Sequence, residues 1–181
     1  MIELPFWFWI AAAVLLFWAV GAYNRLVRLR GDIQHSFAGV EAHIRQRADL
    51  LAAWLTAAAD SLGASAHSVD ALRGACVQVL AAVNHARTAP GTAQAIASLR
   101  LAEEVLIGAR GRLSTELAGH NKLNPEWHTV LQADELAAVD VSLGFARLQF
   151  NDKVQRYNAA AAQFPTWLIA GLFGFSAAGL L

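Results

Sequence analysis

The feature that most constrains this chain is an uncharged run over residues 4–22, which reads LPFWFWIAAAVLLFWAVGA. As an α-helix this run is about 28 Å long, close to the hydrocarbon thickness of a bilayer, about 30 Å. Trp7 and Trp9 lie near one end and Trp18 near the other, and amphipathic indole rings favour the two membrane interfaces. We therefore expect residues 1–22 to be a transmembrane anchor that contacts lipid through these three tryptophans.

The charges that flank this run predict its orientation. Arg25, Arg28 and Arg30 follow it, whereas Glu3 precedes it, and cytoplasmic flanks carry an excess of basic residues. Residues from 23 onward are thus expected in the cytoplasm. A cleaved signal peptide is the alternative, because small residues precede Tyr23, but the start MIELP lacks the basic region that such peptides carry.

Composition agrees with a membrane protein and excludes several other classes. The 181 residues are 56% hydrophobic, and the mean hydropathy is +0.39. Basic and acidic residues balance at 14 each, which removes the positive surface that a nucleic-acid partner would need. Cys76 is the single cysteine, so the chain has neither a disulfide framework nor a CxxC metal pair.

After the anchor, the pattern is helical and prolines divide it. Pro90, Pro125 and Pro165 interrupt the apolar periodicity, and Asn124 before Pro125 is typical of a helix start. The pattern predicts helices at about 5–62, 68–88, 92–118 and 125–164.

Two of these helices have a regular apolar stripe. In the first, apolar residues recur every eleven positions, which is 3.67 residues per turn and keeps the stripe on one face. In the last, apolar residues follow steps of three and four. Short connections make neighbours antiparallel, so we predict an all-α, coiled-coil-like, up-down four-helix bundle over 23–164. The stripes contain Leu26, Phe37, Ala48, Leu29, Val40, Leu51, Leu62, Ile33, Ile44 and Leu55 in the first helix, and Leu136, Val139, Leu143, Ala146, Phe150, Val154, Tyr157, Ala161 and Phe164 in the last.

Residues 165–181 form an apolar tail whose place follows from helix length. Beyond the anchor the first and last helices are each about 60 Å long, so an antiparallel pair returns Phe164 to the level of Tyr23 at the membrane. We expect the tail to lie at the interface or insert shallowly, with Trp167 in contact with lipid. Packing against the bundle is an alternative, and a second span is disfavoured because the tail is short and contains three glycines.

Several short motifs resemble the LemA family. They include YN at 23–24 and 157–158, AR at 146–147 and FN at 150–151, within the longer stretches YNRLVRLRGDIQHSF, RQRADLL, ARLQFNDKVQRYN and FPTWLIAGLFGF. The resemblance implies a bacterial membrane protein with an N-terminal membrane segment, a long antiparallel helical bundle and no established enzymatic activity. The family also includes a member associated with magnetosome membranes.

The chain departs from the family pattern at a few positions. Ala52 and Ala53 replace a Pro-Asn pair, Phe150 replaces a tyrosine, and HN at 120–121 replaces Tyr-Pro. No cysteine ends the anchor, so the lipoprotein form of some relatives does not apply. A function tied to these positions would not carry over.

Nothing in the sequence predicts a catalytic, cofactor or metal site. The six histidines are scattered without HExxH or paired Glu-x-x-His motifs, and phosphate-binding and nucleophile-elbow motifs are absent. The most specific polar feature is a seam on the last helix, formed by Asp140, Arg147, Asn151 and Asn158. This seam predicts either a structural flank that satisfies groups on neighbouring helices or a groove for a partner helix.

Two functional hypotheses follow. The first is a helical scaffold or protein-interaction module, anchored in the bacterial inner membrane, that binds an unidentified membrane or membrane-proximal protein. The second is a lipid-contacting protein that shapes the membrane, in the manner of magnetosome membrane organisation. An enzyme with an unrecognised site is the least favoured class, because no polar groups of the sequence converge on a pocket.

Overall fold

The computed structural model of the protein describes residues 5–58, 66–119 and 134–181, and these residues are almost entirely helical. Its helices are α1 (Phe6–Ala58), α2 (Ala66–Thr88), α3 (Ala93–Gly119), α5 (Asp134–Ala162) and α6 (Thr166–Leu172). The predicted all-α bundle is confirmed, and α2 and α3 begin and end within two residues of their predicted bounds. The predicted end of the first helix at 62, and the predicted N-cap and start at 124–125, lie outside the described residues.

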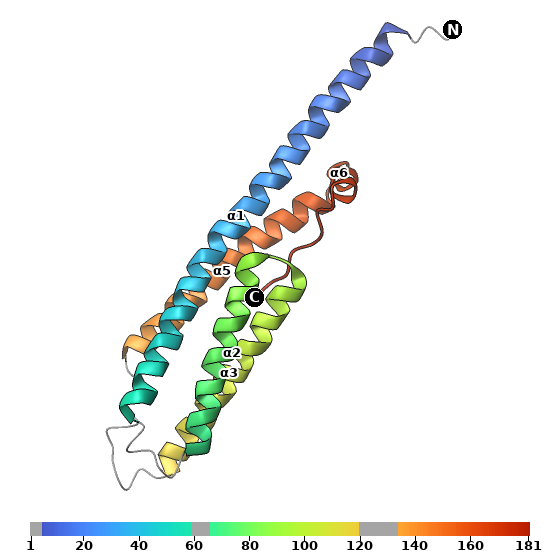
Figure 1. Ribbon diagram of the computed structural model, residues 1–181. Helices are drawn as coiled ribbons and strands as arrows, with labels where there is room; N and C mark the ends of the chain where they lie inside the picture. Colours follow the sequence, from blue (N-terminus) through green and yellow to red (C-terminus); the bar gives the residue numbers. More distant parts are fainter. Residues whose placement is uncertain (1–4, 59–65, 120–133) are drawn as a thin grey trace.

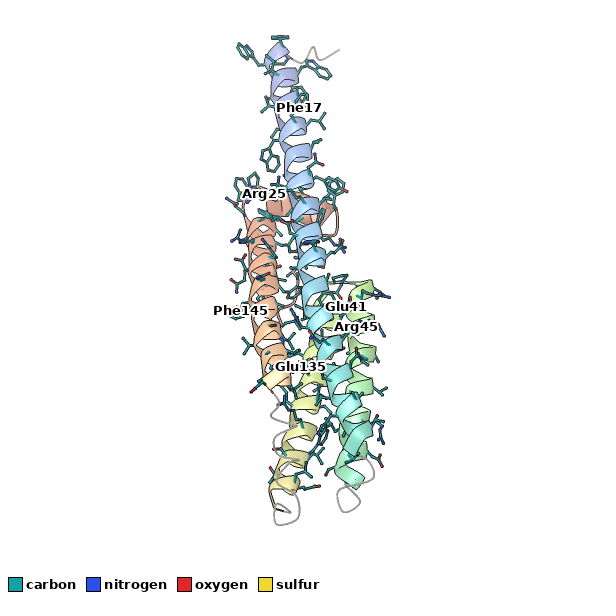
Figure 2. The ribbon with its side chains drawn as sticks, turned by 90° about the vertical axis from the view of Figure 1, so that its left-hand side faces the viewer. Phe17, Arg25, Glu41, Arg45, Glu135 and Phe145 are labelled. Atoms are coloured by element: carbon teal, nitrogen blue, oxygen red, sulfur yellow. The ribbon has the colours of Figure 1, made fainter. Side chains whose placement is uncertain are left out.

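α1 is one continuous helix of 53 residues, about 80 Å long at 1.5 Å per residue. Its N-terminal part projects beyond the other helices, as Figures 1 and 2 show, and its side chains from Phe6 to Phe17 are exposed. An apolar window of 18 residues in this helix has a mean hydropathy of 1.9, and none of it is buried. By length and composition, this segment of α1 can cross a membrane.

The bundle is built from two helix pairs. α1 packs along α5, which runs in the opposite direction, and α2 packs along α3 as a hairpin that leans on α1. Gly91 closes this hairpin with φ +88°, and a Cβ there would lie 3.1 Å from Ile33 Cγ2, so the turn favours glycine for both reasons. Because the turn lies against Ile33, the hairpin covers only the part of the α1–α5 pair that lies beyond Ile33 from the N-terminus of α1.

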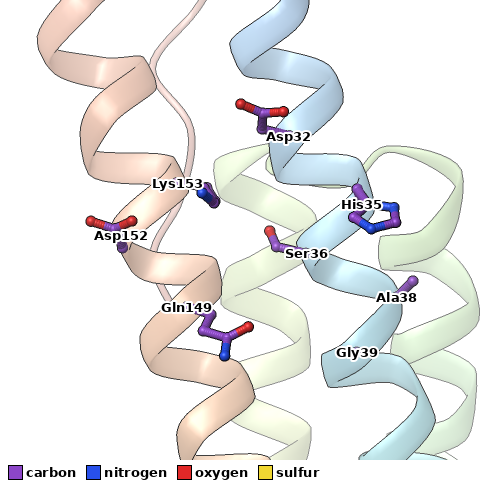
Figure 3. A pocket seen from close by; sticks show the side chains of 8 residues that line it. All are labelled: Asp32, His35, Ser36, Ala38, Gly39, Gln149, Asp152 and Lys153. Carbon is purple, nitrogen blue, oxygen red and sulfur yellow. The ribbon is translucent and has the colours of Figure 1, made fainter.

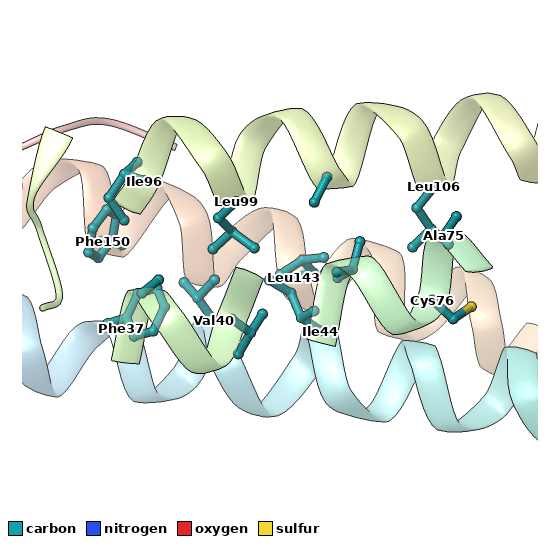
Figure 4. Packing of buried hydrophobic residues seen from close by; sticks show 14 of the residues in the cluster. Phe37, Val40, Ile44, Ala75, Cys76, Ile96, Leu99, Leu106, Leu143 and Phe150 are labelled. Atoms are coloured by element: carbon teal, nitrogen blue, oxygen red, sulfur yellow. The ribbon is translucent and has the colours of Figure 1, made fainter. Parts of the chain in front are cut away.

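The eleven-residue stripe of α1 forms one wall of the core. Eight of its ten predicted members are 1% exposed or less, while Leu29 is half-buried and Leu62 lies outside the described residues. Phe37 meets Phe150 of α5 edge to face, with ring centroids 5.8 Å apart (Figure 4). Full burial of a side chain of this size contributes about 1.5–3 kcal/mol, so the stripe is a major source of bundle stability.

The stripe of α5 is buried along most of its predicted length, with one exception. Leu136, Val139, Leu143, Phe150, Val154 and Tyr157 are buried, and Ala146 and Ala161 are half-buried. Phe164 was predicted in this stripe, and that prediction is wrong, because its side chain is 77% exposed. α5 ends at Ala162 and the chain turns before Pro165, so residue 164 no longer follows the helical face.

The tail divides into an outward-facing and an inward-facing part. Tyr23 contacts the rings of Phe173 and Phe175, with centroids 5.1 and 5.7 Å apart, so the chain does return to the level of Tyr23. α6 leaves several large apolar side chains exposed at this level, whereas residues 175–181 run back along the bundle towards the α2–α3 turn (Figure 1). The exposed side chains in and next to α6 are Phe164, Trp167, Leu168, Leu172 and Phe173.

Candidate functional site

The polar seam predicted on α5 divides into two clusters with different partners. Asp140 and Arg147 take part in ion pairs with α1 and α3. Asn151 and Asn158, closer to the C-terminal end of α5, bind the main chain of the tail. The first cluster is called the charge network below, and the second, with Tyr157, the tail clamp.

Glu103 of α3 lies at the centre of the charge network. Its side chain is only 4% exposed and accepts hydrogen bonds from Arg47 of α1 and Arg147 of α5. Asp140 extends the network, with one oxygen 2.7 Å from Arg110 of α3 and the other 3.5 Å from Arg47. Three arginines and two carboxylates thus join α1, α3 and α5 at one level of the bundle.

A network of this kind favours one register over others. A buried ion pair adds little net stability compared with apolar side chains, because both charges lose their hydration. Removing one partner, however, leaves a buried uncompensated charge, at a cost of about 3–5 kcal/mol. A shift of one helix by a turn would separate Glu103 from Arg47 and Arg147. The network therefore disfavours such a change of register.

Sequence reasoning missed Arg47, Glu103 and Arg110, although the first two left a signal. Arg47 follows Val40 and Ile44 at steps of four and three, so it stands inside the apolar stripe of α1, and Glu103 stands likewise between Leu99 and Leu106. A charged residue at a core position is costly unless it is paired. Two opposite charges at such positions on different helices therefore indicate a buried pair.

Cys76 lies near the same network but is not suited to react. Its side chain is buried, and burial raises the pKa of the thiol, an effect that the positive charge of Arg47 only partly offsets. Since the thiolate is the reactive form of cysteine, a buried, protonated thiol is a structural residue and not a nucleophile.

The tail clamp binds main-chain atoms. Asn158 donates from Nδ2 to the Ala178 carbonyl at 3.0 Å and accepts from the Ala178 amide at 2.8 Å. Asn151 repeats this pairing with Leu181, at 2.8 and 2.9 Å. The Tyr157 hydroxyl donates to the Ser176 carbonyl at 2.9 Å. Burial raises the pKa of Tyr157, with Arg30 opposing the shift, which keeps this hydroxyl protonated as a donor.

The α2–α3 turn forms the opposite wall of the clamp. The Gly179 amide donates to the Gly91 carbonyl at 2.9 Å, and Thr92 pairs with Ala178 as an isolated antiparallel bridge. A Cβ at position 179 would lie 2.9 Å from Ala93 Cα, so only glycine fits there. The tail is therefore enclosed between α5 and the turn.

Compared with known families, the chain matches the LemA family over residues 36–181, a range that includes the charge network, the tail clamp and the tail. The protein belongs to the LemA family. A search of curated proteins found no match to it. Membership in the LemA family and the helical architecture both point to a non-catalytic protein.

An open groove with a volume of about 560 Å³ lies between α1 and α5 of this LemA protein. Figure 3 shows the residues that line this groove, which include Asp32, His35 and Ser36 on α1 and Gln149, Asp152 and Lys153 on α5. The Ser36 hydroxyl donates to the Ile33 carbonyl of its own helix, and Asp152 pairs with Arg156. Ser36 and Asp152 are thus both engaged with groups of their own helices.

The described residues contain no cluster of three or more side chains able to hold a metal ion.

The tryptophans predicted to contact lipid lie in two places. Trp7 and Trp9 are exposed on the projecting part of α1, where Trp18 is half-buried, and Trp167 is 52% exposed on α6. Trp54, at the other end of α1, is buried.

Proposed function

We propose that this LemA protein is a membrane-anchored helical scaffold that presents a rigid bundle to membrane or membrane-proximal proteins. The continuity of α1 carries this proposal, because one unbroken helix contains both the exposed apolar segment and a wall of the bundle core. A bundle attached in this way keeps a fixed angle to its anchor, which is what a scaffold requires. The arginines after the anchor favour a bundle on the cytoplasmic face of a bacterial inner membrane.

Membrane fractionation tests the anchor. Val14→Arg combined with Phe17→Arg places two guanidinium groups in the apolar segment, each at a cost of about 2.5–3.5 kcal/mol at the centre of a span. The double variant should move from the pellet to the supernatant after alkaline carbonate extraction. Val77→Arg is the matched control, because Val77 is 64% exposed on α2 outside the segment, and this variant should stay in the pellet. A double variant that remains in the pellet would contradict the anchor.

Affinity purification in a mild detergent tests the scaffold role. The full-length protein should retain one or more membrane proteins, identified by mass spectrometry, that the carbonate-extractable double variant fails to retain. Retention of the same proteins by both chains would separate partner binding from membrane attachment. A full-length protein that retains none would contradict the scaffold role.

The exposed face of α6 favours a second candidate function, contact with lipid that shapes the membrane. Phe164, Trp167, Leu168, Leu172 and Phe173 are exposed in and next to α6. Phe173 contacts Tyr23, which directly follows the apolar segment. Apolar and aromatic side chains grouped in this way suit insertion into the headgroup region. Electron microscopy of cells that overproduce the protein tests this candidate, since unaltered membranes would count against it.

A further inference from the structure

We propose that the tail clamp is a binding site for the main chain of an extended polypeptide, which residues 175–181 occupy in cis and a partner segment occupies in trans. The inference rests on the proposed interaction role and gives that role a site. The groove already holds a peptide, residues 175–181, through hydrogen bonds to its main-chain atoms.

The chemistry of the clamp is that of main-chain recognition. A carboxamide carries one donor and one acceptor group side by side, and a residue in an extended chain presents its own amide and carbonyl in the complementary order. Asn158 and Asn151 use both groups on single tail residues, Ala178 and Leu181. Since these bonds involve no tail side chain, another sequence whose side chains fit the groove can form the same bonds, as in the addition of a strand to a sheet edge.

The rise between the two asparagines along α5 is close to the rise between the two tail residues that they bind. Asn151 and Asn158 are seven residues apart, which is about 10.5 Å along a helix. Ala178 and Leu181 are three residues apart, which is about 10 Å along an extended strand. The two rises agree within about 1 Å. Because amide and carbonyl groups alternate between the two edges of a regular strand, the tail must also twist between Ala178 and Leu181 for both residues to face α5.

Side chains around the groove define which peptides fit. The position of Gly179 admits only glycine, because a Cβ there would meet Ala93 Cα at 2.9 Å. Ala178 must stay small, because its Cβ faces the Gly91 turn, whereas Leu180 is exposed and unrestricted. Leu181 packs against the core. The expected ligand is therefore an extended segment with a small residue, a glycine, any residue and an apolar residue in succession.

The tail competes with such a ligand because it is tethered. Its effective concentration is in the millimolar range for a short connection, so a free peptide at micromolar concentration is excluded from the wild-type groove. Gly174, with φ +70°, forms the turn between α6 and the bound segment, a conformation that favours glycine. A test must first empty the groove.

The experiment uses the full-length protein in detergent micelles with Gly179→Val, which expels the tail by the clash with Ala93. A fluorescein-labelled peptide FSAAGLL, the sequence of residues 175–181, is titrated and its anisotropy is followed. We expect saturable binding to Gly179→Val and at least tenfold weaker binding to the wild type. Adding Asn151→Ala and Asn158→Ala to Gly179→Val should abolish binding, and a peptide with valine in place of its glycine should not bind.

A Gly179→Val protein that keeps its helical circular dichroism but does not bind the peptide would overturn the proposal, and so would binding that survives loss of both asparagines. If Gly179→Val does not fold, a chain with an equally long Gly-Ser segment in place of residues 175–181 gives the same readout. Absent peptide binding together with retained partners in the affinity purification would reject this site and leave the scaffold role standing.

Discussion

At the scale of single residues, Glu103 shows how the bundle tolerates buried charge. Its carboxylate is almost fully covered, and guanidinium groups from two other helices contact it. The geometry is satisfied only when α1, α3 and α5 are all in place. A single residue of α3 therefore reports on the packing of three helices.

Arg47→Met should destabilise the protein by about 1–3 kcal/mol, because the buried carboxylate of Glu103 loses one charged hydrogen-bond donor while Arg147 stays in place. Arg156→Met is the matched control: Arg156 pairs with Asp152 within one helix, and both side chains are about half exposed or more, so we expect less than about 1 kcal/mol. Urea unfolding followed by circular dichroism measures both free energies. Similar, small losses for the two variants would show that Glu103 does not depend on Arg47.

Tyr157 should make the tail clamp sensitive to alkaline pH. The folded state raises the pKa of its hydroxyl above the ordinary value of 10.0, so the unfolded chain releases this proton first as the pH rises. The contribution of Tyr157 is complete below about pH 10 and is lost as the pH rises through the folded pKa. The stability difference between the wild type and Tyr157→Phe should thus be about 0.5–1.5 kcal/mol at pH 8 and shrink towards pH 11. A difference that stays constant would contradict a buried tyrosine donor.

The candidate site was predicted in part from the sequence. The spacing of Asp140, Arg147, Asn151 and Asn158 was visible as a polar seam beside an apolar stripe. Their partners were not, because Glu103 lies on another helix and the contact depends on a register that α5 alone does not specify. The asparagines were expected to face other helices, but they bind tail main chain, which has no sequence signature.

At the scale of elements, α1 joins two environments in one helix. Its N-terminal part is apolar on every face, as a segment in contact with lipid would be, while the remainder has a single apolar stripe. The eleven-residue period was sufficient to predict that stripe, because a helix shows its buried face directly in its sequence. The end of α5 was harder to predict, since the apolar steps continue to Phe164 although the helix stops at Ala162.

Ile44→Asp tests the stripe. Ile44 is fully buried, so a carboxylate there would lack a partner, and the bundle should lose several kcal/mol of unfolding free energy or fail to fold. Ala42→Asp introduces the same charge two residues away on the exposed face of α1 and should change stability by less than about 0.5 kcal/mol. Thermal melts of the two variants measure this difference. Equal melting temperatures would show that Ile44 is not part of the core.

At the scale of the whole molecule, the tail completes a bundle that its hairpin leaves unfinished. The α2–α3 turn reaches only the level of Ile33, so the part of the α1–α5 pair next to Tyr23 lacks cover from the hairpin. Residues 175–181 fill part of that space, and α6 closes the end beside Tyr23. Residues 175–181 of the tail thus pack against the bundle, while the large apolar side chains of α6 stay exposed.

The exposed face of α6 leads to a prediction about membrane depth. Trp167 lies on a short helix next to the residue that follows the apolar segment, so it should sit at the headgroup level when α1 spans the bilayer. A variant with Trp167 as its only tryptophan, reconstituted with lipids brominated at shallow acyl positions, should lose a large part of its fluorescence. A variant with only Trp54 is the control. Trp54 lies about 45 Å further along α1 than Tyr23 by helix rise, so its fluorescence should be quenched little. Equally weak quenching of both would mean that α6 stays clear of the bilayer, and the lipid-contacting function would then lose its support.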